Sequence, residues 1–306
     1  MRLFDLHCDT LYECYTTKQN LLSNRLQLDL LRGLWNREGW VQAFAVWMPD
    51  TLRGREAYEQ CLRILAFARQ QAQLYNEQML LVQSPEDIRR ALASRRCAAI
   101  LTVEGGSALA GRLEALDTLA SAGVKAIAIT WNGENELGCG SGSGKDDGLT
   151  ALGKKAVRRM EELGILPDVS HLNEHGFWDV LEHTDGPVIA SHSLSAAVHP
   201  HPRNLSDAQF TALVQRGGLV GLNLCAEHLG GQSFERLERH LARYLSLGGE
   251  RAVAFGCDLD GTSLPPEWEG IAVIDRIYDG LLRKNYKEKF LDRLFFGNCY
   301  DFFTEH

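Results

Sequence analysis

Short apolar, β-branched segments alternate with helical patterns along most of the chain, and this alternation constrains the fold more than any other feature. Each segment has the length of a buried strand, and amphipathic stretches separate most of them. Strands that alternate with helices favour a parallel sheet with right-handed crossovers, and eight strands are enough to close a small barrel. The eight segments are 3–7, 41–48, 98–105, 125–130, 165–171, 187–193, 218–224 and 252–258.

The helical stretches between these segments have recognisable beginnings and ends. Residues 84–95 begin with a serine cap, a proline and acidic residues, which is typical of a helix start. Residues 113–123, 206–218 and 235–249 each end at glycine, which is typical of a helix end. We therefore predict a (β/α)8 TIM-type barrel that occupies residues 1–306 as a single catalytic domain.

An open, doubly wound sheet is the alternative for the same alternation, but it requires a glycine-rich phosphate turn after an early strand. The glycine-rich segment 138–148 follows the fourth strand and lacks the Lys-Ser/Thr ending of a phosphate-binding loop. We interpret it as a flexible loop. The apolar run 79–82 predicts a small extra strand outside the barrel, and the C-terminal part predicts a helical decoration.

Length and charge limit the classes of function. The chain has 306 residues, enough for one decorated barrel. Its formal net charge is -8 and it has no run of basic residues, which argues against nucleic acid or an anionic membrane as partner. Neither a signal peptide nor an apolar stretch that could span a bilayer is visible. The eight cysteines form no CxxC pair and indicate reduced thiols, so we expect a cytoplasmic protein.

Five of the predicted strands end in a histidine or a carboxylate. In such barrels the active site lies at the C-terminal ends of the strands, so we expect these side chains to converge. His7 and Asp9 are two residues apart and can reach the same side of an extended strand. Glu104 stands in an apolar run, where an unpaired charge is costly. The candidate metal ligands are His7, Asp9, Glu104, His171 and His192, and Asp258 ends the last strand.

The ligand types indicate which metal this site binds. Imidazole and carboxylate together suit zinc, with manganese, iron or cobalt as alternatives. The set is too large for one tetrahedral ion that keeps an open position, so we expect two divalent ions with Glu104 as their bridge. Such a pair lowers the pKa of a bridging water, and Asp258 can accept its proton and pass it to the leaving group. The pattern predicts a metal-dependent hydrolase with an amidohydrolase-like barrel.

Six short motifs, in this order, resemble the membrane (renal) dipeptidase family of zinc peptidases. They are HCDT, VEGG, DVSH, ASHS, HPRN and GCDLDG, and they extend from residue 7 to residue 261. The resemblance implies a soluble, bacterial-type member that forms a homodimer. It further implies hydrolysis of a small dipeptide, including one with a D-residue at its C-terminal position, by a hydroxide that bridges two zinc ions.

The resemblance also implies roles for single residues, motif by motif. His7, Asp9 and Glu104 would hold one zinc ion. Glu104, His171 and His192 would hold the other. Glu104 is thus the residue shared by both ions, and we expect it to be indispensable for catalysis.

The remaining site residues differ in how well they match the family. Asp258 would be the acid/base residue, and Arg203 in HPRN would bind the free carboxylate of the substrate, for which the planar guanidinium is suited. The animal enzymes have a histidine after the fourth strand that is thought to steady the oxyanion. Here Trp131 replaces it and can donate only through its indole N–H, so Asn132 is a second candidate donor. His228, after the seventh strand, is a further candidate for contacting the substrate.

Two alternative functions stay open. A binuclear amidohydrolase acting on another amide or ester, such as a lactonase or phosphotriesterase, usually begins with HxH and bridges its metals with a modified lysine on the fourth strand. Here the first strand reads HCD, and Lys125 lies at the beginning of the fourth strand. The other alternative is a catalytically weakened member, or a barrel kept only for binding, after the loss of the histidine replaced by Trp131. The retained Asp258 favours an enzyme.

Overall fold

The computed structural model describes residues 1–268 and 270–305, and its centre is a closed parallel barrel. Closure is complete because β1 pairs with β2 on one side and with β9 on the other, while β2 also pairs with β4. This arrangement confirms the predicted eight-stranded barrel. Its strands are β1 Arg2–Asp5, β2 Gly39–Trp47, β4 Cys97–Glu104, β5 Val124–Ala128, β6 Leu166–Asp168, β7 Ile189–Ala190, β8 Leu219–Leu222 and β9 Val253–Phe255.

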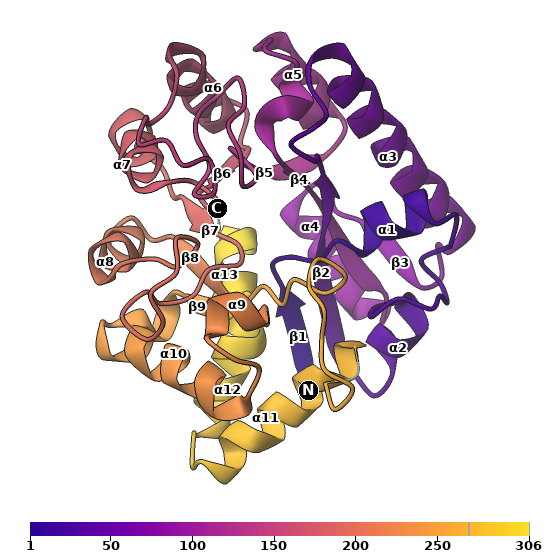
Figure 1. The fold of residues 1–306 in the computed structure, drawn as a ribbon. Coiled ribbons are helices and arrows are strands. Elements are labelled where there is room, and N and C mark those ends of the chain that lie inside the picture. Colours follow the sequence, from indigo (N-terminus) through magenta and orange to yellow (C-terminus); the bar gives the residue numbers. More distant parts are fainter. Residues whose placement is uncertain (269, 306) are drawn as a thin grey trace.

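The strand β3 (Met79–Leu81) pairs in parallel with the first residues of β4 and stands outside the barrel, as predicted. Helices surround the barrel as an outer ring (Figure 1). Ser84 starts α4 as the predicted serine cap, and both Ser84 and Ser206 form capping boxes at the starts of α4 and α8. The helices of this ring are α3 Gly54–Leu74, α4 Pro85–Ala93, α5 Glu114–Ser121, α6 Ala151–Glu162, α7 Glu174–His183, α8 Asp207–Gln215 and α10 Phe234–Ser246.

The C-terminal decoration is helical, as predicted, and it closes one end of the barrel. It consists of α11 (Val273–Arg283), α12 (Glu288–Asp292), a π-helical turn (Arg293–Gly297) and α13 (Asn298–Glu305). Apolar side chains of the turn and of α13 pack in one buried cluster with side chains from several barrel strands. In Figure 1, α13 lies at the centre of the helical ring. That cluster includes Phe4, Val41, Ala98, Ile100, Ala126, Phe296 and Cys299.

Two short helices, α1 (Thr10–Thr16) and α9 (Ala226–Leu229), occupy loops at the other end of the barrel. A third, α2 (Leu30–Leu34), precedes β2, and its Gly33 faces the ring of Trp40 near the start of that strand. No helix within the described residues combines the length and the apolar composition needed to cross a bilayer.

Several strands are shorter than predicted, and the difference concerns the site. The sequence places His7, His171 and His192 inside strands, whereas the ladders end at Asp5, Asp168 and Ala190. The apolar pattern continues past the last ladder hydrogen bond, so pattern alone cannot locate the strand end. At His171 the backbone has a φ of 73°, in the left-handed region, and a β-strand cannot continue through a residue with that conformation.

Candidate active site

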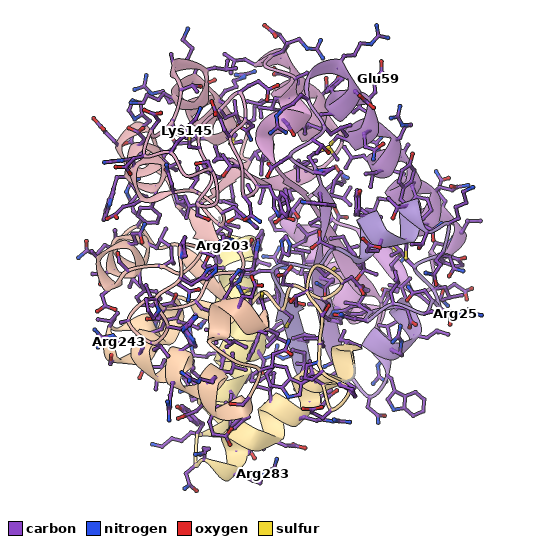
Figure 2. The ribbon with its side chains drawn as sticks, viewed as in Figure 1. Arg25, Glu59, Lys145, Arg203, Arg243 and Arg283 are labelled. Carbon is purple, nitrogen blue, oxygen red and sulfur yellow. The ribbon has the colours of Figure 1, made fainter. Side chains whose placement is uncertain are left out.

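The ends of the strands that point away from α13 surround a cavity of about 350 Å³. Every candidate metal ligand lies at this end, on the last residue of a strand or in the segment that follows it. Arg203 lies near the middle of the view in Figure 2, whereas Arg25, Glu59 and Arg283 lie at the periphery. The cavity lining includes Asp9, Glu104, Trp131, Asn132, His171, Arg203, His228 and Asp258.

Glu104, the last residue of β4, is the centre of the polar cluster. Its Oε1 lies 2.7 Å from Nε2 of His171 and 3.5 Å from Nε2 of His192. Its Oε2 lies 3.5 Å from Nε2 of His7. Each oxygen of one carboxylate thus faces a different set of histidines, which is the arrangement required of a residue that bridges two ions.

The second group of candidate ligands lies around His7. Its Nε2 is 3.5 Å from Oδ2 of Asp9 and 3.7 Å from Oδ1 of Asp258. Asp9 directly precedes α1, and Asp258 follows β9, so residues from opposite ends of the chain meet here. The contact is held by the backbone, because Asp258 N donates to the carbonyl of His7 at 3.1 Å.

Two neighbouring side chains orient the histidines that face Glu104. Oδ1 of Asn132 lies 2.8 Å from Nδ1 of His171, and Oγ of Ser191 lies 2.7 Å from Nδ1 of His192. An amide oxygen can only accept, so Nδ1 of His171 bears the proton and its Nε2 is free to ligate. The two Nε2 atoms are 2.9 Å apart. Partners of this kind orient most metal-binding histidines.

The donor set fits a divalent cation. Nε2 of His7 and Oδ1 of Asp9 are buried and have no hydrogen-bond partner among the described residues. Three carboxylates, from Asp9, Glu104 and Asp258, approach the same imidazole in a region shielded from water. Such a concentration of buried negative charge is costly unless cations compensate it.

The pKa shifts of the three carboxyl groups reflect their burial and their closeness to one another. Burial raises the pKa of Asp258 well above its ordinary value, and the carboxylates of Asp9 and Glu104 add to that effect. Burial, with Glu104 as the next cause, raises the pKa of Asp9 to about 6. Burial also opposes the ionisation of Glu104, but the neighbouring His7 and His171 outweigh it and lower its pKa well below the usual range. Glu104 is therefore the carboxylate that stays ionised most readily.

The segment after β9 contains features of the site that the sequence did not reveal. Asp258 and Asp260 both have left-handed backbones, with φ of 61° and 70°. Asp260 accepts from Thr10 Oγ1 at 2.5 Å and from the backbone of Gln27 at 2.7 Å, which ties this segment to the loop after β1. A Cβ on Gly261 would lie 2.2 Å from Oδ2 of Asp9 and 2.3 Å from Oδ1 of Asp258. The Asp-Gly pair in GCDLDG was the available signal for this turn.

Arg203 lies in the loop after β7 and lines the cavity. Its side chain is only 6% exposed, and its Nε and one terminal nitrogen are buried without a partner among the described residues. Burial lowers the pKa of Arg203, while Glu104 and Asp258 oppose that shift. A buried guanidinium with free donors is suited to receive an anionic group of a ligand.

Aromatic rings form the wall of the cavity next to His171. Tyr12 packs edge-on against Trp47 at 4.9 Å, and Trp47 packs edge-on against Trp131 at 5.1 Å. Trp131 lies 6.2 Å from the ring of His171. Trp131 thus lines the cavity as part of an aromatic wall, a contact set that the sequence did not reveal because its partners come from α1 and β2.

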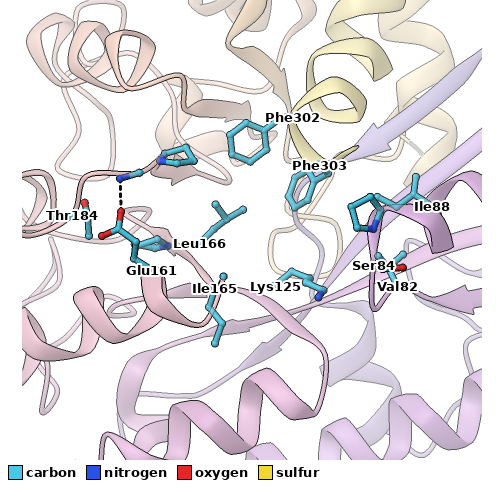
Figure 3. Close-up of a pocket in the computed structure, with 15 residues that line it drawn as sticks. Val82, Ser84, Ile88, Lys125, Glu161, Ile165, Leu166, Thr184, Phe302 and Phe303 are labelled. Carbon is cyan, nitrogen blue, oxygen red and sulfur yellow. Dashed lines mark hydrogen bonds between the residues drawn. The ribbon is translucent and has the colours of Figure 1, made fainter. Parts of the chain in front are cut away.

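A second hollow, of about 280 Å³, lies at the opposite end of the barrel, beside α13 (Figure 3). Leu166 and Phe303 line it, and its charged groups already have protein partners. Lys125 Nζ donates to the carbonyl of Gln83 at 2.7 Å, and Glu161 accepts from backbone amides of the 185–186 turn. Lys125 is thus remote from the candidate metal ligands, which argues against a lysine-bridged metal pair.

The chain is similar to proteins of one peptidase family. The family model described as membrane dipeptidase (peptidase family M19) matches residues 1–305. An uncharacterised protein from the pqqA 5' region of Klebsiella pneumoniae is 34% identical over 237 residues, which are 71% of this chain and 85% of that protein. An uncharacterised protein from the PQQ-III 3' region of Acinetobacter calcoaceticus is 34% identical over 169 residues, 53% of this chain and 53% of that protein.

Solved structures give the same result. A metallopeptidase from Rhodobacter sphaeroides, liganded with a phosphinate mimic of the dipeptide L-Ala-D-Ala, has a TM-score of 0.90 at 25% identity, with 98% of this chain and 97% of that chain covered. A metallopeptidase described as a dipeptidase of family M19 has a TM-score of 0.91 at 26% identity, with the same coverage of 98% and 97%. With its barrel and its ordered strand-end motifs, the chain therefore belongs to the membrane dipeptidase family, peptidase family M19.

Proposed function

We propose that this protein is a zinc-dependent dipeptidase that hydrolyses the peptide bond of dipeptides. The observation that supports this most is the buried Glu104 carboxylate, whose oxygens face His171 and His192 on one side and His7 on the other. His7, Asp9 and Glu104 would hold one ion, and Glu104, His171 and His192 the other. When bound, two divalent ions would polarise the scissile carbonyl and lower the pKa of the attacking water.

The protein's own groups would bind the substrate and move protons. Asp258 would accept the proton of the attacking water and return it to the leaving amine, the general acid/base role. Arg203 would receive the free carboxylate of the dipeptide through its unpaired donors. Trp131 would cover the substrate from the aromatic wall, and the Asn132 amide would contact it while orienting His171.

The test is release of amino acids from dipeptides with L- or D-residues at the C-terminal position, before and after removal of metal with a chelator. We expect metal-dependent cleavage, together with about two zinc ions per chain. Glu104→Gln is expected to abolish cleavage and to lower the metal content, whereas Glu86→Gln, on the exposed side of α4, is expected to change neither. Full activity of Glu104→Gln would contradict the proposal.

Two results would support other functions. A protein that holds two metal ions but cleaves no dipeptide would indicate another amide or ester as substrate. Turnover that is metal-dependent but very slow, and that increases in Trp131→His, would indicate a weakened member of the family. The homodimer, the cytoplasmic location and a single catalytic domain over residues 1–306 complete the proposal, and size-exclusion chromatography with light scattering tests the homodimer.

A further inference from the structure

Asn223 is a buried residue directly after β8, and its neighbours fix the orientation of its side chain. Its Nδ2 donates to the carbonyl of His192 at 3.0 Å, and its Oδ1 accepts from the backbone N–H of Cys225 at 3.2 Å. A carbonyl can only accept and a backbone N–H can only donate. The amide of Asn223 therefore has one allowed orientation.

This orientation determines the protonation of His228. Nδ2 of Asn223 also lies 3.1 Å from Nδ1 of His228. Because that nitrogen is a donor, Nδ1 of His228 must accept, and the ring proton must be on Nε2. Burial and the neighbouring Arg203 lower the pKa of His228 to about 2, which agrees with a neutral ring. His228 is thus a neutral imidazole with a fixed tautomer.

His228 lies in the same cavity as Arg203 and is connected to the segment that bears the candidate metal ligand His192. Nδ2 of Asn204, the residue after Arg203, donates to the carbonyl of His228 at 2.8 Å, so the two loops are joined. Through Asn223, His228 is also connected to the backbone of His192. Its Nε2–H has no acceptor among the described residues, so this donor is free for a ligand.

We propose that the Nε2–H of His228 is a second donor, beside Arg203, for the free carboxylate of the substrate, and that Asn223 is the positioning residue that fixes this donor. The inference rests on the proposed dipeptidase function and adds a determinant of specificity to it. A carboxylate offers acceptors to both the guanidinium and the imidazole N–H. A C-terminal amide presents an NH2 group to one of them, so the pair selects dipeptides with a free carboxylate over their amides.

The test compares two substitutions whose amide groups take the positions of different imidazole nitrogens, Nδ1 for Asn and Nε2 for Gln. Asn in place of His228 can accept from Asn223 but has no donor at the position of Nε2, whereas Gln can place an N–H there. His228→Asn is expected to raise KM for a dipeptide about ten- to hundredfold with little change in kcat. The preference for the acid over its C-terminal amide should decrease to a similar extent, and His228→Gln should recover most of both losses. His175→Asn, on the exposed face of α7, is the matched control.

Nitrogen-15 NMR of the imidazole rings supplies a readout that is independent of turnover. The wild-type protein is expected to show His228 as the Nε2–H tautomer from pH 8 down to pH 5. A signal typical of the Nδ1–H tautomer, or of imidazolium in that range, would overturn the inference. So would an unchanged acid-to-amide preference in His228→Asn that retains its full metal content.

A phosphinate dipeptide mimic and its C-terminal amide separate this inference from the proposed function. Calorimetry with both compounds measures carboxylate selection without hydrolysis. If the wild type cleaves no dipeptide but binds the acid more tightly than the amide, and His228→Asn loses that difference, the dipeptidase function fails and the inference stands. If the wild type cleaves dipeptides and His228→Asn keeps the difference, the function stands and the inference fails.

Discussion

At the scale of single residues, the site depends on close approaches that leave no room for larger side chains. Gly261 lies where Asp9 and Asp258 meet, and any Cβ there would overlap a carboxylate oxygen. Two of the non-glycine residues with a left-handed backbone, His171 and Asp258, belong to the site itself. Backbone strain of this kind persists where the surrounding structure holds it, and functional sites are common places for it.

We predict that Gly261→Ala lowers kcat/KM about a hundredfold, because it displaces Asp9 or Asp258 while most of the fold is kept. Steady-state kinetics and metal analysis measure the effect. Gly297→Ala is the matched control, since the nearest atom to its new Cβ would be 3.5 Å away, an ordinary contact. Equal activity of the two variants would show that the approach at Gly261 is unimportant.

Asn132 gives a second prediction for a single side chain. Removing its carbonyl oxygen in Asn132→Leu leaves Nδ1–H of His171 without its acceptor and should lower metal affinity about ten- to hundredfold. Asn132→Asp keeps an acceptor at that position and should retain the affinity. Competition with a chelator, in the absence of substrate, measures both variants. An affinity of Asn132→Leu equal to that of the wild type would contradict the orienting role.

At the scale of elements, helices at the rim of the barrel hold the loops of the site in place. α10 is joined to two of these loops by His240, which is fully buried. Its Nδ1 accepts from the backbone of Ser195 at 3.0 Å, and its Nε2 donates to the carbonyl of Leu229 in α9 at 3.3 Å. This pair of bonds requires a neutral ring.

The stability of the fold should therefore depend on pH through His240. Burial lowers the pKa of His240 to about 4 in the folded protein, below its ordinary unfolded value of about 6.5. The unfolded chain then binds the extra proton first. The contribution to stability is complete above about pH 6.5 and is lost as the pH falls towards 4, by at most about 1.4 kcal/mol per pH unit.

Denaturant unfolding of the metal-loaded protein between pH 7.5 and pH 4.5 measures this dependence. His240→Gln keeps one donor and one acceptor without a titrating group, so its free energy of unfolding should fall less steeply with decreasing pH. Parallel pH profiles for the two proteins would show that His240 does not contribute.

At the scale of the whole molecule, the two ends of the barrel separate function from stability. The candidate metal ligands meet at the C-terminal ends of the strands, while Phe296 and its neighbours fill the opposite end. Phe296 lies 6.4 Å from the ring of Phe4, and the guanidinium of Arg2 lies over it at 4.3 Å. Barrel enzymes commonly divide the roles of their two ends in this way.

We predict that Phe296→Ala lowers the free energy of unfolding by about 3–5 kcal/mol, the usual cost of a large cavity in a core. The kcat/KM of the folded fraction should stay near that of the wild type, since the metal ligands are remote. Chemical unfolding and kinetics at low temperature test both parts. Trp35→Ala, at a side chain that is 75% exposed, is the aromatic control and should affect neither. A loss of metal from Phe296→Ala would contradict the separation.

The sequence by itself determined the fold class and the polar groups at the strand ends. Alternating strands and helices, eight strand patterns and the serine cap at Ser84 are local properties, so they could be read without coordinates. Glu104 could be identified as a candidate site residue because a carboxylate in an apolar strand needs a compensating partner. The strand ends could not be located, because hydrophobicity continues beyond the last ladder hydrogen bond.

Only the tertiary structure decided how these groups meet and what state they are in. The approach of His7 to Asp258 depends on pairing between β1 and β9, which are separated by nearly the whole chain. The tautomers of His171 and His228 depend on contacts with Asn132 and Asn223, and the amide orientation of Asn223 follows from its bonds to His192 and Cys225. A sequence pattern records which residues are apolar and how they are spaced. Distances between remote side chains, and the proton positions that those distances impose, arise only when the barrel closes.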